Sequence, residues 1–272
     1  MVPKHAHGVQ PGGGLRGERQ ALPPNALSLS DVSREFGGLR AVDGVSLEVR
    51  PGERRALIGP NGAGKTTLFS IISGEQAPSA GRISLFGRDV TRLAPYRRAA
   101  LGLARTYQIT NLFPKLTVQA NCVLAAQALR PVKYHLHRAL ERYGALFARA
   151  REVLEAVGLA AKADAVVRSL SHGEQRQLEI ALALAGAPKL LLLDEPTAGL
   201  SPAESQMMTA LLKRLDPAIT LLVIEHDMDV AFALADRITV LHYGRVVADG
   251  RADEVRASPL VQEIYLGTLG SA

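Results

Sequence analysis

Polar and apolar residues alternate along the first regular part of the chain. The alternation over Leu27–Phe36 and over Val45–Val49 predicts strands with one buried and one solvent-facing side. The pairs Gly37-Gly38 and Asp43-Gly44 supply turn signals between these stretches. The pattern therefore predicts a hairpin or meander of antiparallel strands near the N-terminus.

Beyond the middle of the chain, the pattern changes to short apolar runs separated by helical stretches. The expected strands are Lys189–Leu193, Ile219–Ile224, Ile238–His242 and Arg245–Ala248, and the expected helices are Ala203–Leu215 and Met228–Ala235. Runs without polar interruption are typical of strands covered on both faces, as in a parallel sheet. Alternating strands and helices predict an α/β fold with a mainly parallel, doubly wound sheet.

The segment between these two regions has a helical pattern. Leu146, Ala150, Val153 and Val157 form an apolar stripe at helical spacing. We expect an inserted α-helical subdomain at about 95–175 within a domain that spans 27–267. The Gly- and Pro-rich residues 1–26 predict a disordered tail, and 268–272 a short C-terminal one.

Composition narrows the class of protein. The chain has 272 residues, 47% of them hydrophobic, which is enough for a sizeable core. No apolar run approaches the roughly 18 residues that a membrane-spanning helix needs. The single cysteine, Cys122, excludes an internal disulfide. The net charge of +6 is modest, and the Arg-rich stretch 82–105 is expected to be a solvated face, so no nucleic-acid partner is predicted.

The strongest chemical signal is GPNGAGKTT at Gly59–Thr67, which fits the phosphate-loop pattern G-x-x-x-x-G-K-[ST]. It stands between a predicted strand, Arg55–Ile58, and a predicted helix, Lys65–Ser73, as this motif requires. Glycines let the loop aim its amides at phosphate, the lysine adds a positive charge, and a threonine hydroxyl can bind Mg²⁺. The loop alone leaves kinases, GTPases and ATPases open, and the residues expected to hold the nucleotide are Asn61, Gly62, Ala63, Gly64, Lys65, Thr66 and Thr67.

Four further residues lie at or just after the ends of predicted strands and complete a reaction site. Asp194 and Glu195 end the strand LLLLDE, where an acid can hold Mg²⁺ and the next acid can polarise water. Gln108 is a candidate metal ligand and water-orienting residue. His226 follows the strand TLLVIE and is a candidate catalytic residue. The predicted catalytic set is Glu195, His226, Gln108 and Lys65, and the predicted Mg²⁺ ligands are Thr66, Gln108 and Asp194.

A second anion-binding helix start is predicted at LSHGEQ. Ser171 and Gly173 precede a helix that carries Glu174 in its first turn. One ATP does not need two such cradles from one chain. Two copies that face each other would use both, because each phosphate loop would meet the partner's helix start.

Together these motifs resemble the ATP-binding subunit of an ABC transporter. GPNGAGKTT is similar to the Walker A loop, Gln108 to the Q-loop, LSHGEQ to the signature, LLLLDE to Walker B and His226 to the switch histidine. The resemblance implies a P-loop NTPase core of the RecA type, an ATPase activity, and adenine stacking on Phe36. Two positions depart from the family pattern: Ser201 ends the D-loop AGLS where many members have Asp, and His172 replaces the commoner glycine.

Within the family, GLARTYQITNLFPKLTVQANC and LHYGRVVADG resemble the ATPases of branched-chain amino acid importers, which also take up other hydrophobic amino acids and amides. That implies a second ATPase chain, identical or paralogous, two transmembrane permeases, and indirectly a solute-binding protein. It also implies a peripheral place on the cytoplasmic face of the bacterial inner membrane. Urea importers and lipopolysaccharide exporters use similar subunits, and a soluble ABC ATPase or an inactive binding module is a further alternative.

Overall fold

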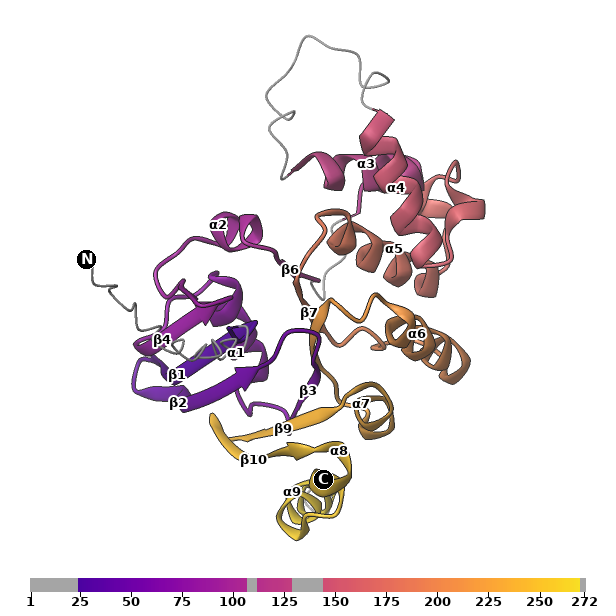
Figure 1. Ribbon diagram of the computed structural model, residues 1–272. Coiled ribbons are helices and arrows are strands. Elements are labelled where there is room, and N and C mark those ends of the chain that lie inside the picture. The colour runs from indigo at the N-terminus through magenta and orange to yellow at the C-terminus, as the bar shows by residue number, and fades with distance from the viewer. Residues whose placement is uncertain (1–23, 107–111, 129–143, 270–272) are drawn as a thin grey trace, which may run out of the picture.

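A mostly parallel sheet runs through the protein and carries the phosphate loop at the end of one strand (Figure 1). The computed structural model describes residues 24–106, 112–128 and 144–269. In the described part of the chain, the sheet has the order β10-β9-β3-β8-β7-β6. These strands are β3 (Arg54–Ile58), β6 (Leu103–Arg105), β7 (Leu190–Asp194), β8 (Thr220–Ile224), β9 (Arg237–His242) and β10 (Arg245–Arg251). All neighbours pair in parallel except β10 with β9, which confirms the predicted α/β class.

The central strands β7 and β8 are buried along their whole length. Leu190 and Leu192 face one hydrophobic cluster, whereas Leu191 and Leu193 face another on the opposite side of the sheet. Both faces are thus covered, which explains why these strands have no polar alternation.

The second sheet is antiparallel and has the strand order β2-β1-β4-β5, as the N-terminal alternation predicts. Its strands are β1 (Leu27–Phe36), β2 (Leu39–Val49), β4 (Ala80–Leu85) and β5 (Arg88–Asp89). The turn predicted at Asp43-Gly44 is wrong, because β2 continues through it. The pairing of β1 with β2 shifts there, and Gly44 has a φ of +62°, so the extra residue forms a bulge instead of a turn.

Helices cover the sheets and form a separate bundle at the upper right of Figure 1. The bundle consists of α3 (Val118–Ala128), α4 (Gly144–Ala156) and α5 (His172–Ala185), and the predicted stripe of α4 is buried in it. The other helices are α1 (Lys65–Ser73), α2 (Pro95–Ala100), α6 (Pro202–Arg214), α7 (Met228–Leu234), α8 (Ala252–Arg256) and α9 (Pro259–Leu269). None of the helices in the described ranges has the length and apolarity needed to cross a bilayer. The predicted tails fall largely outside the described residues, and the domain limits remain predictions.

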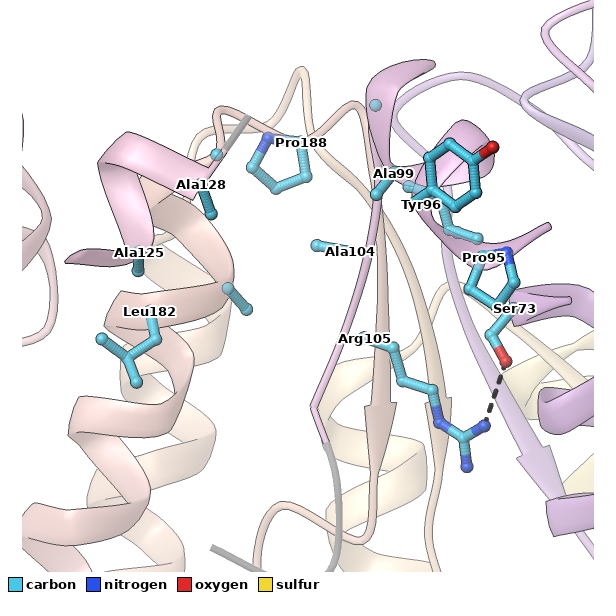
Figure 2. A pocket seen from close by; sticks show the side chains of 14 residues that line it. Ser73, Pro95, Tyr96, Ala99, Ala104, Arg105, Ala125, Ala128, Leu182 and Pro188 are labelled. Atoms are coloured by element: carbon cyan, nitrogen blue, oxygen red, sulfur yellow. Dashed lines mark hydrogen bonds between the residues drawn. The ribbon is translucent and has the colours of Figure 1, made fainter. Parts of the chain in front are cut away.

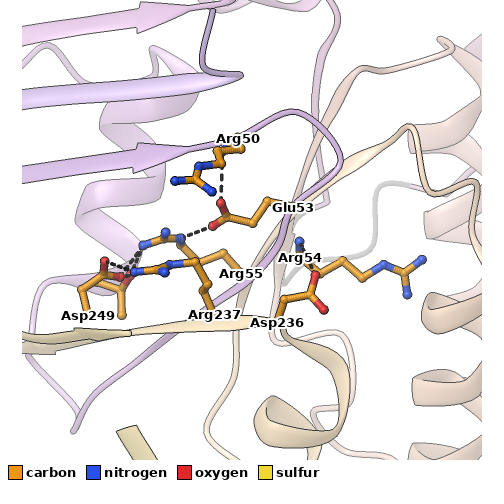
Figure 3. Close-up of polar contacts among 8 residues, drawn as sticks. Arg50, Glu53, Arg54, Arg55, Asp236, Arg237 and Asp249 are labelled. Atoms are coloured by element: carbon orange, nitrogen blue, oxygen red, sulfur yellow. Dashed lines mark hydrogen bonds and ion pairs between the residues drawn. The ribbon is translucent and has the colours of Figure 1, made fainter. Parts of the chain in front are cut away.

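Buried charges hold β3 in place at its amino end (Figure 3). The guanidinium of Arg55 donates to Glu53 Oε1 at 2.6 Å and to Thr239 Oγ1 at 2.9 Å, and it pairs with Asp249. Arg237 adds a second contact to Asp249 at 3.1 Å. This network joins β3 to β9 and β10, so the strand that leads into the phosphate loop is tied to its neighbours.

The Arg-rich stretch 82–105 is not a solvated face throughout, which corrects the sequence prediction. Arg98 is 1% exposed and donates to the carbonyl oxygens of Ile71 and Ile72, both at 2.7 Å. These carbonyls lie in the last turn of α1, where helix oxygens lack the regular amide partner four residues on and a cation is favourable. Arg98 therefore caps the helix that follows the phosphate loop.

Candidate functional site

The loop between β3 and α1 is closely enclosed by neighbouring backbone. A Cβ at Gly59 would lie 2.1 Å from the carbonyl oxygen of Leu241, and one at Gly64 would lie 2.2 Å from that of Ala41. Both glycines also have positive φ, +153° and +99°, which other residues rarely adopt. These two positions therefore require glycine, as the motif predicts.

Lys65, the first residue of α1, is buried in the loop. Its Nζ donates to the carbonyl oxygens of Gly59 at 2.7 Å and Pro60 at 3.1 Å. Burial lowers the pKa of Lys65, while the nearby carboxylates of Glu195 and Asp194 act in the opposite direction. The ammonium is thus placed within the loop and close to both predicted acids.

The phosphate loop and two of the predicted catalytic residues line one cavity of about 430 Å³. The lining residues are Ala41, Asn61, Gly62, Ala63, Gly64, Lys65, Thr66, Thr67, Glu195 and His226. Ala41 comes from β2, and the other residues follow the ends of β3, β7 and β8 or begin α1, at the carboxyl edge of the parallel sheet. The structure therefore brings together residues that are up to 185 positions apart in the sequence, from Ala41 to His226.

Glu195 has a backbone conformation unusual for its residue type. Its φ is +50°, and its amide donates to the carbonyl oxygen of Ile224 on β8 at 3.0 Å. Its carboxylate oxygen Oε1 contacts Nε2 of His226. Strain of this kind persists where the surrounding structure fixes a functional side chain.

Asp194 is 3% exposed, and residues at the end of β6 bind it by hydrogen bonds. Its Oδ2 accepts from Nη2 of Arg105 at 3.0 Å, and its amide donates to Thr106 Oγ1 at 3.3 Å. The other carboxylate oxygen, Oδ1, is buried and has no hydrogen-bond partner among the residues that the structure describes. Burial raises the pKa of Asp194, whereas Arg105 acts to lower it.

The residues present fit a Mg²⁺ ion. A hard divalent cation binds carboxylate and hydroxyl oxygens, and Oδ1 of Asp194, which no described residue contacts by a hydrogen bond, supplies one such ligand atom. Thr66 lines the cavity with an exposed side chain. Gln108, the third predicted ligand, lies outside the described residues.

The other predicted anion-binding helix start is not part of this cavity. Ser171 caps α5 through a reciprocal box in which its hydroxyl accepts from the amide of Glu174 and the carboxylate of Glu174 accepts from the amide of Ser171. Lys162 pairs with Glu174 and, as the main cause, lowers the pKa of that carboxyl. Ser171, Gly173 and Glu174 therefore form a second, separate feature of the chain's surface.

The unusual His172 lies beside the D-loop of the same chain. A Cβ at Gly199 would be 3.3 Å from His172 Nε2, and one at Gly173 would be 2.9 Å from Glu204 Oε1. The signature and the start of α6 are thus in close contact.

Phe36, the predicted adenine platform, ends β1 with 41% of its surface exposed. The Arg34 guanidinium lies 4.5 Å from the centre of its ring. Phe36 does not line the loop cavity. Its role toward adenine remains a prediction.

A second hollow, of about 390 Å³, separates the helical bundle from the sheet (Figure 2). Figure 2 shows Ala125, Ala128 and Leu182 of α3 and α5 on one side, and Tyr96 and Ala99 of α2 on the other. We call this hollow the interdomain groove. From the sequence QITNLFP, we also expect Leu112 and Phe113 to be exposed in a loop at the edge of the helical subdomain, where a permease helix could dock, although neither residue lines this groove. Phe113 is 55% exposed, but Leu112 packs against the helical core, so the expectation for Leu112 is wrong.

Sequence reasoning missed Arg105 and Arg98. Both arginines belong to a run of basic residues in the sequence. Such a run does not distinguish a solvated arginine from a buried one. The available signal for Arg105 was its place at the end of a short strand, three residues before Gln108.

Comparison with known proteins agrees with this geometry. A family model described as ABC transporter matches residues 42–198, and one described as branched-chain amino acid ATP-binding cassette transporter matches 245–269. The high-affinity branched-chain amino acid transport ATP-binding proteins BraF of Pseudomonas aeruginosa and LivG of Escherichia coli are each 37% identical, over 89% of this chain and 97% of their own length.

Solved structures agree as well. The ADP conformation of MJ1267, an ATP-binding cassette of an ABC transporter, has a TM-score of 0.79 and 30% identity, covering 89% of this chain and 99% of that one. The cbiO1 protein of Clostridium perfringens, part of the ABC transporter complex cbiONQ, has a TM-score of 0.76 and 26% identity, covering 89% and 95%. The chain therefore belongs to the ABC transporter family and is one of its ATP-binding cassettes.

Proposed function

We propose that this chain hydrolyses ATP to drive the import of branched-chain or other hydrophobic amino acids and amides across a bacterial inner membrane. The observation that carries the proposal is the common cavity of the phosphate loop, Glu195 and His226. A phosphate cradle, a carboxylate and an imidazole at one sheet edge are the groups that ATP hydrolysis needs.

In the proposed reaction, the loop amides and Lys65 hold the phosphates of ATP. Glu195 takes a proton from a water molecule, whose oxygen forms a bond to the γ-phosphorus while the bond to the ADP oxygen breaks. His226 orients the Glu195 carboxylate, which it already contacts, and reaches the γ-phosphate. Thr66, Asp194 and Gln108 would hold Mg²⁺, which neutralises phosphate charge when bound.

We further propose that two chains close head to tail over two ATP molecules. Ser171, Gly173 and Glu174 of one chain would meet the phosphate loop of the other, since their own loop cavity does not include them. The opposite chain is identical or a paralogous ATPase. No nucleic-acid partner is proposed.

The interdomain groove supports two permease subunits as membrane partners. Its walls are rich in small apolar side chains and come from both the helical bundle and the sheet region. A permease helix bound there would contact both parts, so a movement of the bundle relative to the sheet would be transmitted to it. The proposal therefore includes a peripheral position at the cytoplasmic face of the membrane, with a solute-binding protein as an indirect partner.

The choice of solute rests on the relatives and on the C-terminal match at 245–269. A urea importer, a lipopolysaccharide exporter and a soluble ABC ATPase are the alternatives. The test compares uptake of labelled leucine and labelled urea by cells that lack this chain, with the parent or Glu195→Gln restored. Leucine uptake that returns only with the parent supports the proposal, and restored urea uptake alone contradicts the assignment of the solute.

A further inference from the structure

Arg105 lies between two carboxylates at the end of β6. Its side chain is 7% exposed, and Nη2 donates to Oδ2 of Asp194 at 3.0 Å. On the other side, Nη1 pairs with Oε2 of Glu75 at 3.0 Å. One guanidinium therefore connects the predicted metal carboxylate to the segment that follows α1.

The Nη1 side of Arg105 is itself firmly anchored. Nη1 also lies 3.3 Å from Ser70 Oγ and 3.2 Å from Ser73 Oγ, both in the last turns of α1. Figure 2 shows the contact with Ser73. Because α1 begins at the phosphate loop, Arg105 ties the far end of this helix to the strand that carries Asp194.

The contacts divide the two oxygens of Asp194 between different partners. Arg105 donates to Oδ2, and Oγ1 of the next residue, Thr106, accepts a hydrogen bond from the Asp194 amide. Within ranges 24–106, 112–128 and 144–269, the buried Oδ1 has no hydrogen-bond partner, as expected of a ligand atom for a cation. A charge-assisted bond from a planar guanidinium fixes the rotation of a carboxylate better than a flexible ammonium can.

We propose that Arg105 is a positioning residue that orients Asp194 for Mg²⁺ during nucleotide binding. The inference rests on the proposed ATP site, and it adds a residue that no motif of the sequence assigns. Arg105 also lines the interdomain groove, so the proposed docking surface and the metal carboxylate share one side chain.

Two other roles for Arg105 predict different behaviour. If the ion pair only stabilises the fold, its loss lowers the melting temperature without changing the Mg²⁺ requirement. If Arg105 instead competes with the metal for the Asp194 carboxylate, its loss lowers the Mg²⁺ concentration that nucleotide binding requires. An orienting role raises it, since loss of a group that orients a ligand typically weakens metal binding about 10–100-fold.

The test titrates MgCl₂ into the full-length chain with a fluorescent ATP analogue, for the parent and Arg105→Lys. Lysine keeps the charge and loses the two-sided fork. The matched control is Arg98→Lys, the same change at a buried arginine that also contacts the end of α1 but has no hydrogen bond to Asp194 among the described residues. Thermal unfolding of each variant shows that it is folded at the temperature of the titration.

Arg105→Lys should need about tenfold more Mg²⁺ for half-maximal enhancement of binding, with metal-free affinity unchanged, and Arg98→Lys should match the parent. An unchanged or lower Mg²⁺ requirement in Arg105→Lys would overturn the proposal. A parent chain that binds no analogue under any condition would overturn the ATP site as well. If Arg105→Lys does not fold, Glu75→Gln is the second variant, because it removes the charged partner on the other side of Arg105. It should also raise the Mg²⁺ requirement, and an unchanged Mg²⁺ requirement in Glu75→Gln would count against the proposal.

Discussion

His226 Nε2 contacts Glu195 Oε1 at the carboxyl edge of the sheet, and both residues line the phosphate-loop cavity. The two side chains follow neighbouring parallel strands, β7 and β8, and their backbones are joined by the hydrogen bond from Glu195 to Ile224. The imidazole is therefore held in register with the carboxylate that we assign as the general base.

From this contact we predict that His226→Ala lowers ATP hydrolysis by about 10²-fold, the lower range for loss of a group that assists proton transfer. His226→Gln should lose less, because its amide can still donate to Glu195. Steady-state hydrolysis by the assembled complex measures both. Equal losses in the two variants would contradict an orienting role for the imidazole.

Glu225 predicts a dependence of stability on pH. It is 3% exposed and accepts from Thr197 Oγ1 at 2.9 Å, and burial raises its pKa from 4.5 to about 7. Between these values the folded protein keeps a proton that the unfolded chain releases, so this group's contribution to stability falls as pH rises through the window. Glutamine has no proton to release in this range, so Glu225→Gln removes this loss of stability with rising pH.

The free energy of unfolding of Glu225→Gln, relative to the parent, should therefore increase from about pH 5 to about pH 8 by on the order of 1–3 kcal/mol. Denaturant unfolding at the two pH values measures the difference. A difference between variant and parent that stays constant with pH would show that Glu225 does not titrate in this window.

The interdomain groove predicts a matched pair of variants on α2. Ala99 lines the groove and Ala100 is exposed beside it without lining it. Ala99→Glu places a charge in the apolar groove and should reduce recovery of the chain with membranes by roughly tenfold or more, as expected for burying an unpaired charge. Ala100→Glu should bind as the parent does. Equal membrane recovery of both variants, with normal melting temperatures, would count against the groove as the docking surface.

The shared-site arrangement makes a further prediction about mixtures. Ser171→Arg places a cation at the signature without touching its own phosphate loop, and Lys65→Ala weakens ATP binding in the chain that carries it. Each variant alone should be inactive, but excess Ser171→Arg mixed with Lys65→Ala should regain activity, because a mixed dimer has one intact loop facing one intact signature. Full activity of the Ser171→Arg chain alone would contradict the shared site, while a mixture that stays inactive beside an active native complex would indicate a paralogous partner.

The main parts of the fold and of the catalytic cavity could be predicted from the sequence because their residues carry strong local constraints. Gly59 and Gly64 have no alternative in a loop pressed against Leu241 and Ala41, and uniformly apolar strands are typical of a sheet covered on both sides. The loop, Glu195 and His226 consequently meet where the strand order places them.

The parts that could not be predicted depend on long-range packing. Arg98 and Arg105 both belong to a basic run, and only packing distinguishes them: the end of α1 makes Arg98 a helix cap, and the pairing of β6 with β7 lets Arg105 reach Asp194. Gly44 reads as a turn signal but lies in a bulge, because β1 continues to pair with β2 on both sides of it. The partial burial of Leu112 also depends on long-range packing, because this side chain packs against the helical core.

The most direct test of the central claim measures ATP binding and hydrolysis by Glu195→Gln in the assembled membrane complex. Glutamine has nearly the same shape as glutamate but cannot accept a proton from water at neutral pH. We predict that the variant binds ATP as the parent does and hydrolyses it about 10²–10⁴-fold more slowly. Hydrolysis at the parent rate would contradict the assignment of Glu195 as the general base, and with it the mechanism proposed for this chain.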